Sequence, residues 1–537
     1  MPKKKVVLLG ASNSLIKNGL CSGLRENDEF DIINLALGAS SCTQNLYEAV
    51  RNRRILEEAE LIITESNVVD INLSGDASMN FTLELFYRNV NWLYAYLYFL
   101  NKKILCLILP RFATNYKIIN NIHRKLALKY GFNVIDLHKY YEENNLQEFH
   151  HRMDSVHPQA GIMRELGKSI INNFALYKEP LDLDIKNDNP VFSIVTPQDM
   201  KLEKGSLECI ERKNSFFNET AFRLTKETRL GFPYWCKGYY LIAAHTWNAS
   251  DEKGEFGLEL SRKTMSQIGI YNTTMRCIHQ VNSLNTFFEI QNNSFLLDEE
   301  SFLSGYENDE TMKIYPTWTH KEAKATIEYC DCIAFFLAKD GGNFYNEKID
   351  FKDLEDENVQ IEQGYDFYDI IPSIRVYKEL IDEYCALFIP RHTHHLRHSI
   401  ALLQNELSLL KPKASQRIQS YLCYKLGFAM VHNSKGILNR LKLPFLLMAI
   451  ALEHKAKQQR YKESIAKNPA LKLPALETLP DYKEALEIKE HLSYKLGKTF
   501  LQRYKNKWGG GIVKFLVCDV ARLQREHRQK IQKNASD

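Results

Sequence analysis

The chain has 537 residues, of which 45% are hydrophobic and 25% charged, and its formal net charge is +4 at pH 7. This length allows several domains, and this composition excludes a largely disordered or low-complexity protein. No stretch of about 18 apolar residues free of charge occurs, so a membrane-spanning helix is not expected. The 11 cysteines are odd in number and scattered. We therefore expect reduced thiols in a water-soluble, cytoplasmic protein.

The first 180 residues alternate between apolar runs and amphipathic stretches. The run at 5–11 begins at the last of three lysines, but its apolar part is uninterrupted only from Val6 to Leu9, which is too short for an export signal and typical of a buried parallel strand. Further strands are predicted at 30–37, 59–66, 103–110 and 132–137, with helices between them, as at 41–58 and 79–101. This order predicts an α/β domain over residues 1–180, with helices on both faces of a parallel sheet.

The middle of the chain differs in character. Short aromatic or β-branched runs recur between turn-rich gaps, at 220–225, 237–247, 256–262, 274–281, 285–291 and 332–338. They predict a mainly-β, sandwich-like domain over residues 187–342. A charged, mixed connector is then expected over residues 343–410.

The C-terminal region, 411–537, is basic and has helical periodicity. It contains 26 Lys and Arg against 10 Asp and Glu, and the words Leu-x-Tyr-Lys-Leu-Gly at 422–427 and 492–497 repeat after 70 residues. Two copies are fewer than a solenoid needs, so we predict an α-helical domain with two related hairpins. The charge is spread over the helices without a nucleic-acid-binding motif, which favours an anionic membrane surface or a glycolipid phosphate over nucleic acid.

Small polar residues follow three of the predicted strands. Ser12 comes after the first strand, Gly38 after the second and Asn67 after the third. Because parallel strands end at the same edge of a sheet, where ligands bind, these residues are expected to converge. A serine in such a turn can act as a nucleophile, and a glycine N–H and an asparagine amide can stabilise an oxyanion. Each residue type is also common in ordinary turns and helix caps.

Asp154 and His157 follow the last predicted strand and precede a helix. A nucleophilic serine needs a base within hydrogen-bonding reach, and that base needs a carboxylate to fix its tautomer. These two residues on one turn supply both groups. The alternative is a helix-capping aspartate next to a surface histidine.

The order Gly-x-Ser, Gly, Asn and Asp-x-x-His-Pro resembles the SGNH or GDSL hydrolases, which are flavodoxin-like, three-layer esterases, deacetylases and acyltransferases. The resemblance covers about residues 1–175. It implies Ser12 as the nucleophile, with His157 as its base and Asp154 as the orienting carboxylate. It also implies an oxyanion hole formed by Ser12, Gly38 and Asn67.

The sequence departs from this family at two places. Ala11 stands where the family has Asp, and the Glu65 to Val68 segment replaces Gly-x-Asn-Asp. Ser14 is the fallback nucleophile.

Two further stretches are candidates for substrate binding. In the aromatic segment 231–248, Trp235, His245 and Trp247 either contact a sugar or belong to the core, since alternation along a strand buries half of its residues. In the histidine cluster 392–398, His392 and His395 are candidates for an anionic sugar or phosphate contact. A metal site is not expected there, because Arg391 precedes the cluster, Arg397 lies within it, and it contains no acidic residue or cysteine.

The tail's Tyr-Lys-Leu-Gly helices and basic Trp-Gly-Gly turn resemble C-terminal extensions of bacterial enzymes that build capsule or lipopolysaccharide. Together the resemblances imply acyl transfer on a bacterial surface polysaccharide or glycolipid precursor, by a sugar O-acetyltransferase or O-acetylesterase with an acyl-Ser12 intermediate. No cofactor is required, although a transferase needs a donor such as acetyl-CoA or another acyl carrier. The implied location is cytoplasmic, with peripheral contact to the anionic inner membrane through the basic tail. The alternative is a non-acyl glycan-modifying or glycan-binding protein whose site lies in the β domain and at His392–His398, with a degenerate SGNH scaffold.

Overall fold

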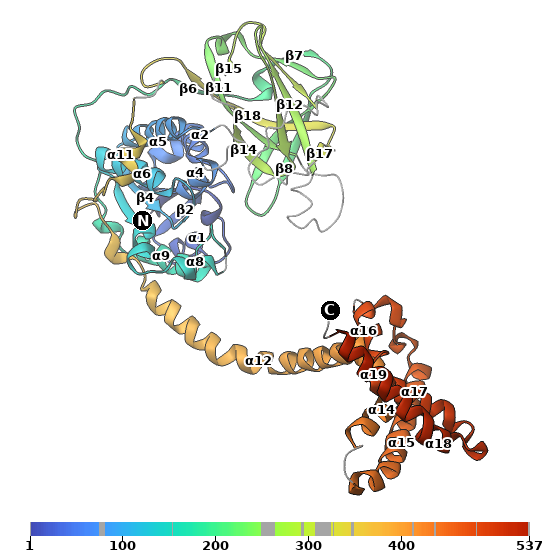
Figure 1. Ribbon diagram of the computed structural model, residues 1–537. Helices are drawn as coiled ribbons and strands as arrows, with labels where there is room; N and C mark the ends of the chain where they lie inside the picture. Colours follow the sequence, from blue (N-terminus) through green and yellow to red (C-terminus); the bar gives the residue numbers. More distant parts are fainter. Residues whose placement is uncertain are drawn as a thin grey trace. The chain divides into compact units, whose positions relative to one another are not determined.

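The computed structural model describes residues 2–74, 81–152, 154–248, 264–290, 295–306, 324–325, 327–344, 348–410, 413–433, 437–479 and 481–534. The chain divides into two compact units, Met1–Asp382 and Glu383–Asp537 (Figure 1). Each unit is described by itself below.

The first unit begins with a parallel sheet of five strands, in the order β2-β1-β3-β4-β5. Its strands are β1 Lys4–Leu9, β2 Phe30–Asn34, β3 Leu61–Thr64, β4 Lys103–Ile108 and β5 Asn133–Asp136. The apolar runs are buried on both faces of the sheet, as parallel strands require. The predicted parallel α/β domain is therefore confirmed. The strand order puts β1 between β2 and β3, so the turns after these three strands are neighbours.

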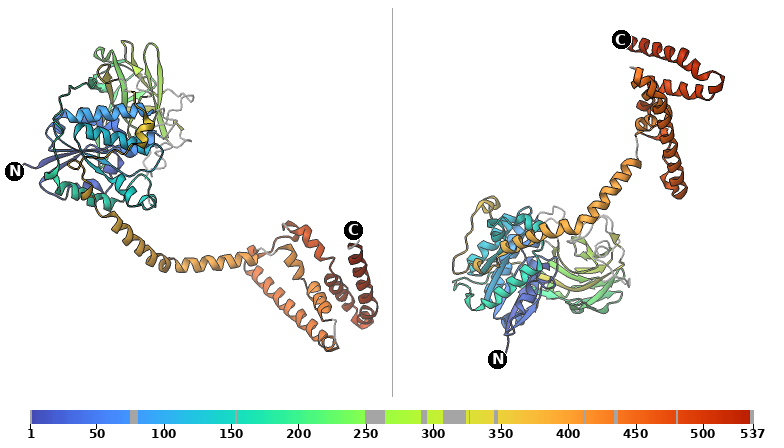
Figure 2. Two further views of the ribbon diagram at one scale, coloured as in Figure 1. Left: turned by 60° about the vertical axis from the view of Figure 1, so that its left-hand side comes forward. Right: turned by 90° about the horizontal axis from the view of Figure 1, so that it is seen from below.

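Helices cover both faces of this sheet (Figures 1 and 2). One face packs on α2, α5 and α6, and the other on α1, α7 and α9. The helices of this region are α1 Leu20–Leu24, α2 Cys42–Arg51, α3 Arg53–Glu57, α4 Asn67–Ser74, α5 Leu83–Tyr98, α6 Tyr116–Tyr130, α7 Leu137–Glu143, α8 Gln147–His151 and α9 Ala160–Asn172.

A β-rich region follows, as predicted. One sheet has the order β13-β12-β16-β10-β7 with β17 beside β12, and the other has the order β14-β11-β18-β9-β8 with β15 and β6 attached. The bounds are β6 Phe192–Val195, β7 Lys201–Lys204, β8 Glu208–Lys213, β9 Asn218–Thr225, β10 Arg229–Gly231, β11 Tyr239–Trp247, β12 Thr264–Tyr271, β13 Arg276–Asn282, β14 Asn285–Glu289, β15 Phe295–Leu296, β16 Phe302–Gly305, β17 Lys324–Ala325 and β18 Tyr329–Lys339. The predicted strand at 256–262 lies outside the described residues.

The α/β and β regions share a hydrophobic core. Tyr47 of α2 packs against Phe287 of β14 and Phe336 of β18, with ring centroids 4.9 and 5.9 Å apart. The Ser41 hydroxyl, which caps α2, also donates a hydrogen bond to Glu289 of β14. The two regions were expected as separate domains, but this shared core places them in one unit.

The first part of the expected connector, 343–410, packs on the α/β region. Helix α11, Phe351–Asp356, packs on α6. The Val134 N–H donates to Tyr365 O at 2.8 Å, and the Phe367 N–H donates to Val134 O at 2.9 Å, which adds a short bridge to the edge strand β5. The segment returns to the first sheet because its apolar side chains, among them Phe367 and Ile374, complete the core there. Helix α12, Ile374–Leu410, begins at this point.

The second unit is helical, as predicted. After α12 it contains α13 Ala414–Gln419, α14 Leu422–His432, α15 Ile437–Lys467, α16 Tyr482–Ile488, α17 Leu492–Tyr504, α18 Gly511–Lys514 and α19 Val520–Asn534. The two repeat words form α14 and α17, which pack on each other. A Cβ on Gly427 would lie 1.6 Å from Ser493 O, and one on Gly497 would lie 1.7 Å from Cys423 O. The repeat therefore conserves the glycine that lets each copy approach the other.

No helix among the described residues is both long enough and apolar enough to cross a bilayer.

Candidate active site

The turn after β1 presents Ser12. The strand ends at Leu9, and Ser12 to Ser14 form a single 3₁₀ turn, η1 Ser12–Ser14. Gly10 is required at the start of this turn, because an added Cβ would lie 2.4 Å from Ser14 Oγ and 2.8 Å from Glu65 Oε1. The turn leaves Ser12 half-buried at the carboxyl edge of the sheet.

Ser12, His157 and Asp154 form one hydrogen-bonded chain. Ser12 Oγ lies 2.8 Å from His157 Nε2, and His157 Nδ1 lies 2.6 Å from Asp154 Oδ2. Asp154 Oδ1 also accepts the Val156 N–H at 2.8 Å. Burial alone raises the pKa of Asp154, but the hydrogen bonds from His157 and Val156 outweigh it and hold the pKa below its ordinary value. The ionised carboxylate thus keeps a proton on Nδ1, which leaves Nε2 free to accept the Ser12 proton.

The loop that carries Asp154 and His157 is held from two sides. Asn13 Nδ2 donates to Val156 O at 3.3 Å. Arg111, just after β4, donates from Nη1 to Ser155 O at 3.0 Å and from Nε to Asn72 Oδ1 at 2.7 Å. The sequence interpretation missed Arg111. Its place directly beyond the fourth strand is the signal that would have found it.

Two backbone N–H groups are available as oxyanion donors. Within the described part of the chain, neither the Ser12 N–H nor the Gly38 N–H makes a hydrogen bond. The turns that carry them are neighbours, since the Leu37 N–H donates to Gly10 O at 3.1 Å. Both groups therefore suit a developing oxyanion at this edge.

Asn67, the third predicted donor, has a different role. Its Nδ2 donates to Leu109 O and to Asn120 Oδ1, both at 2.9 Å, and its Oδ1 accepts the Leu109 N–H. An amide nitrogen has only two protons, so none remains for an oxyanion. Asn67 is a fully buried link between α4, the end of β4 and α6, and its predicted place in the oxyanion hole is corrected.

Glu65 lies directly beneath the turn that carries Ser12, and the sequence did not predict a role for it. Its side chain is only 1% exposed. Its Oε1 accepts the Ala11 N–H and the Ser14 hydroxyl, both at 2.8 Å, whereas no described residue contacts Oε2 through a hydrogen bond. Burial raises the pKa of this carboxyl to about 7. Because Ser14 is buried and bonded to Glu65, it does not serve as the fallback nucleophile.

The predicted substrate-binding residues have different surroundings. Trp235 is 48% exposed and lines a cleft. His245 and Trp247 are buried, and His245 is bonded to Tyr47 and Asn285 at 3.1 and 2.7 Å, so neither residue is available to a substrate. Their expected role is corrected: β11 is covered on both faces, because one side of its sheet packs on α2.

His392 and His395 belong to the second unit, where both are exposed on α12. Among the described residues, no group of three or more His, Cys, Asp or Glu side chains is arranged to bind a metal ion.

Comparisons with known proteins cover separate parts of the chain. A family model for a domain of unknown function, DUF8374, matches residues 347–529. No curated protein matches the chain.

Similar solved structures include the acetyl xylan esterase AlAXEase, with 18% identity, coverage of 32% of this chain and 98% of that one, and a TM-score of 0.27. The lipase/acylhydrolase from Enterococcus faecalis has 16% identity, coverage of 34% and 100%, and a TM-score of 0.27. A catalytic mutant of the acetylxylan esterase Axe2 from Geobacillus stearothermophilus has 12% identity, coverage of 33% and 94%, and a TM-score of 0.26. These structural neighbours are esterases and acylhydrolases.

Proposed function

We propose that the protein is a serine-dependent acyl-transfer enzyme that acts through an acyl-Ser12 intermediate. The observation that supports this most directly is the hydrogen-bonded chain from Ser12 through His157 to Asp154, at 2.8 and 2.6 Å. A serine, a histidine with a free nitrogen and an orienting carboxylate are the groups that acyl transfer needs.

The reaction proceeds in two halves. His157 Nε2 takes the Ser12 proton while Oγ attacks the acyl carbonyl, and the Ser12 and Gly38 N–H groups stabilise the resulting oxyanion. The tetrahedral intermediate collapses to an acyl-serine as His157 returns the proton to the leaving oxygen or sulfur. In the second half His157 deprotonates the acceptor, which attacks the acyl-serine, and Ser12 recovers its proton.

The proposed substrate is a sugar of a bacterial surface polysaccharide or glycolipid precursor, which is O-acylated in the esterase direction and has a free hydroxyl in the transferase direction. With water as the acceptor the enzyme is an O-acetylesterase. With a sugar hydroxyl as the acceptor it is an O-acetyltransferase, and the acyl group comes from acetyl-CoA or another acyl carrier. Neither direction requires a cofactor, because the nucleophile, the base and the oxyanion donors all belong to the chain.

The test uses the full chain with p-nitrophenyl acetate and a fluorescent phosphonate that labels nucleophilic serines. Ser12→Ala is expected to abolish labelling and to lower the rate by about 10³-fold or more, since the acyl-enzyme no longer forms. Ser206→Ala, an exposed serine of the β region, is the control and should behave as the wild type. Labelling that survives Ser12→Ala would refute the nucleophile. Activity lost on replacing His392 and His395, but kept in Ser12→Ala, would favour the alternative site.

The second unit supports a further part of the proposal, peripheral contact with an anionic membrane surface. Trp508 is 93% exposed, and the neighbouring Val513, Leu516 and Val517 are also exposed. Lysines 505, 507 and 514 lie exposed among them. An exposed indole and aliphatic side chains that enter the headgroup region, surrounded by ammonium groups, fit an anionic bilayer surface. This contact would keep the enzyme near lipid-linked glycan precursors in the cytoplasm.

A further inference from the structure

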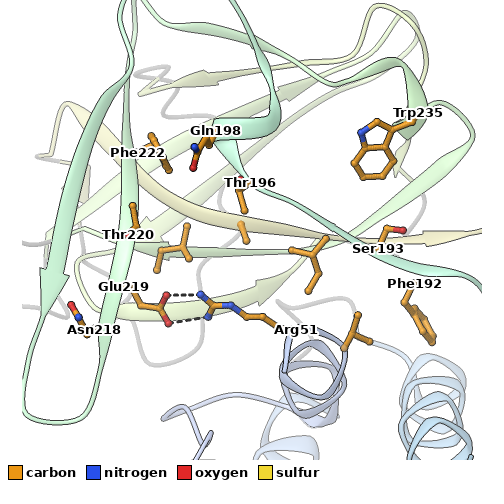
Figure 3. Close-up of a pocket in the computed structure, with 14 residues that line it drawn as sticks. Arg51, Phe192, Ser193, Thr196, Gln198, Asn218, Glu219, Thr220, Phe222 and Trp235 are labelled. Atoms are coloured by element: carbon orange, nitrogen blue, oxygen red, sulfur yellow. Dashed lines mark hydrogen bonds and ion pairs between the residues drawn. The ribbon is translucent and has the colours of Figure 1, made fainter. Parts of the chain in front are cut away.

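A cleft lies on the side of the first unit where the α/β and β regions meet (Figure 3). It has a volume of about 730 Å³ and is lined by the C-terminal end of α2, by β6, β9 and β18, and by Trp235. Neither Ser12 nor His157 contributes to it. Helix α2 leads from the Gly38 turn to this cleft, and its rise of 1.5 Å per residue places Arg51 about 14 Å along the helix from Cys42.

A gap in the sheet opens the cleft. Residues 329–332 of β18 pair with β9, and residues 335–338 pair with β6 on the same edge. Between them, Ile333 and Ala334 meet no strand on that edge within the described residues, and both line the cleft. A gap of two residues is about 7 Å long, which is too short for an added peptide strand. The space suits a ligand built of rings.

Aromatic side chains lie at this cleft. Trp235 comes from a short 3₁₀ turn, η5 Tyr234–Cys236, and its indole is held edge-on by Tyr239 with ring centroids 6.0 Å apart. Phe192 and Phe222 are partly buried among the lining residues. A half-exposed indole in such a place offers a flat apolar face, which is the surface that the C–H face of a pyranose ring packs against.

Four uncharged polar side chains of the lining have no hydrogen-bond partner among the described residues. Ser193, Gln198, Asn218 and Thr220 line the cleft, and their side chains make no hydrogen bond within the described part of the chain. Hydroxyls and amides both donate and accept, as ligand hydroxyl groups require.

The charged residues that line the cleft neutralise each other. Arg51 donates to both carboxylate oxygens of Glu219, at 2.9 and 2.6 Å, as Figure 3 shows. A bidentate pair of this kind leaves the guanidinium little capacity for a phosphate or carboxylate ligand. The cleft therefore favours a neutral ligand over an anionic one.

We propose that this cleft is a binding site for a neutral oligosaccharide, separate from the Ser12 centre. The aromatic face, the free hydroxyl and amide groups and the compensated charge all fit this class of ligand. Binding to the cleft is independent of Ser12. Its use as an anchor for a glycan that is acylated or deacylated at Ser12 rests on the proposed function.

Calorimetric titration of the full-length Ser12→Ala protein tests the site without turnover. The probes are cellohexaose, xylohexaose, mannohexaose and hexa-N-acetylchitohexaose, with hexagalacturonate as the anionic comparison. At least one neutral probe is expected to bind with a Kd of about 1 mM or tighter. Adding Trp235→Ala should weaken that binding about tenfold or more, and Asn218→Ala should weaken it too. Tyr234→Ala is the matched control, because Tyr234 is the exposed neighbour of Trp235 but does not line the cleft.

Three results would overturn the site. They are the absence of binding by every neutral probe up to about 10 mM, tighter binding of hexagalacturonate than of any neutral probe, and equal effects of Trp235→Ala and Tyr234→Ala. Turnover of p-nitrophenyl acetate by the wild type separates the two proposals. Binding of a neutral probe that is lost in Trp235→Ala supports the cleft, whereas inactivity of the wild type on esters contradicts the Ser12 proposal and leaves the binding result standing.

Discussion

Replacing Glu65 by Gln should change how the stability of the protein depends on pH. In the folded protein burial raises the pKa of Glu65 from its ordinary value of 4.5 to about 7. The folded state therefore holds this proton more tightly than the unfolded chain does. The stabilisation that this proton gives the folded state is fully present below about pH 4.5, and it is lost as the pH rises through about 7.

The size of the effect follows from the pKa difference. The rise of the Glu65 pKa from 4.5 to about 7 corresponds to about 3 kcal/mol, most of which is lost between pH 5 and pH 8. Glutamine keeps an oxygen that accepts the Ala11 N–H and the Ser14 hydroxyl, but it has no proton to lose. We therefore expect the free energy of unfolding of Glu65→Gln, relative to that of the wild type, to rise by about 2–3 kcal/mol from pH 5 to pH 8.

Urea unfolding at the two pH values measures this difference, with the fluorescence of the first unit as the signal. Comparing the variant with the wild type at each pH cancels the titration of all other groups. Glu60→Gln, which replaces an exposed carboxylate on the same domain, is the control and should follow the wild type. A relative stability of Glu65→Gln that is the same at pH 5 and pH 8 would show that Glu65 does not hold a proton in the folded state.

Three more predictions test other parts of the molecule. Asp154→Asn should lower kcat for p-nitrophenyl acetate by about 10² to 10⁴-fold at pH 7, because an amide no longer fixes the proton on His157 Nδ1; a kcat equal to that of the wild type would contradict the assigned role. Gly427→Ala should destabilise the helical unit by about 1–3 kcal/mol in thermal unfolding, since its Cβ would lie 1.6 Å from Ser493 O, whereas Gly161→Ala adds a Cβ with no atom within 4 Å and should have no such effect. Trp508→Ala should reduce co-flotation of the full chain with phosphatidylglycerol vesicles, and flotation that is equal for the two proteins would remove Trp508 from the membrane contact.

The fold of the first sheet was predictable because its strands are short apolar runs bounded by turns. Parallel strands are buried on both faces, so the run from Val6 to Leu9 needs no alternation to be recognised. The aromatic segment left two interpretations open, the core and a sugar contact. Strand β11 was expected to expose half of its residues, but its second face packs on Tyr47 of α2, and His245 and Trp247 are buried there. Packing between regions about 200 residues apart leaves no local signal in the sequence.

The sequence predicted which residues lie at the site better than it predicted where their side chains point. Parallel strands end at one edge of the sheet, so the positions of Ser12, Gly38 and His157 after three of its strands predicted that all three lie at this edge. Such a position does not determine where a side chain points. Glu65 and Asn67 both follow β3 and are two residues apart. The Glu65 side chain points toward the turn that carries Ser12, whereas the Asn67 side chain points toward Leu109 at the end of β4. The partners of the Asn67 amide lie 42 and 53 residues further along the chain, so only hydrogen-bond accounting in three dimensions reveals that both amide protons are used. In the proposed reaction the oxyanion would therefore meet backbone N–H groups, which a substitution of Asn67 would affect only through the packing of α4.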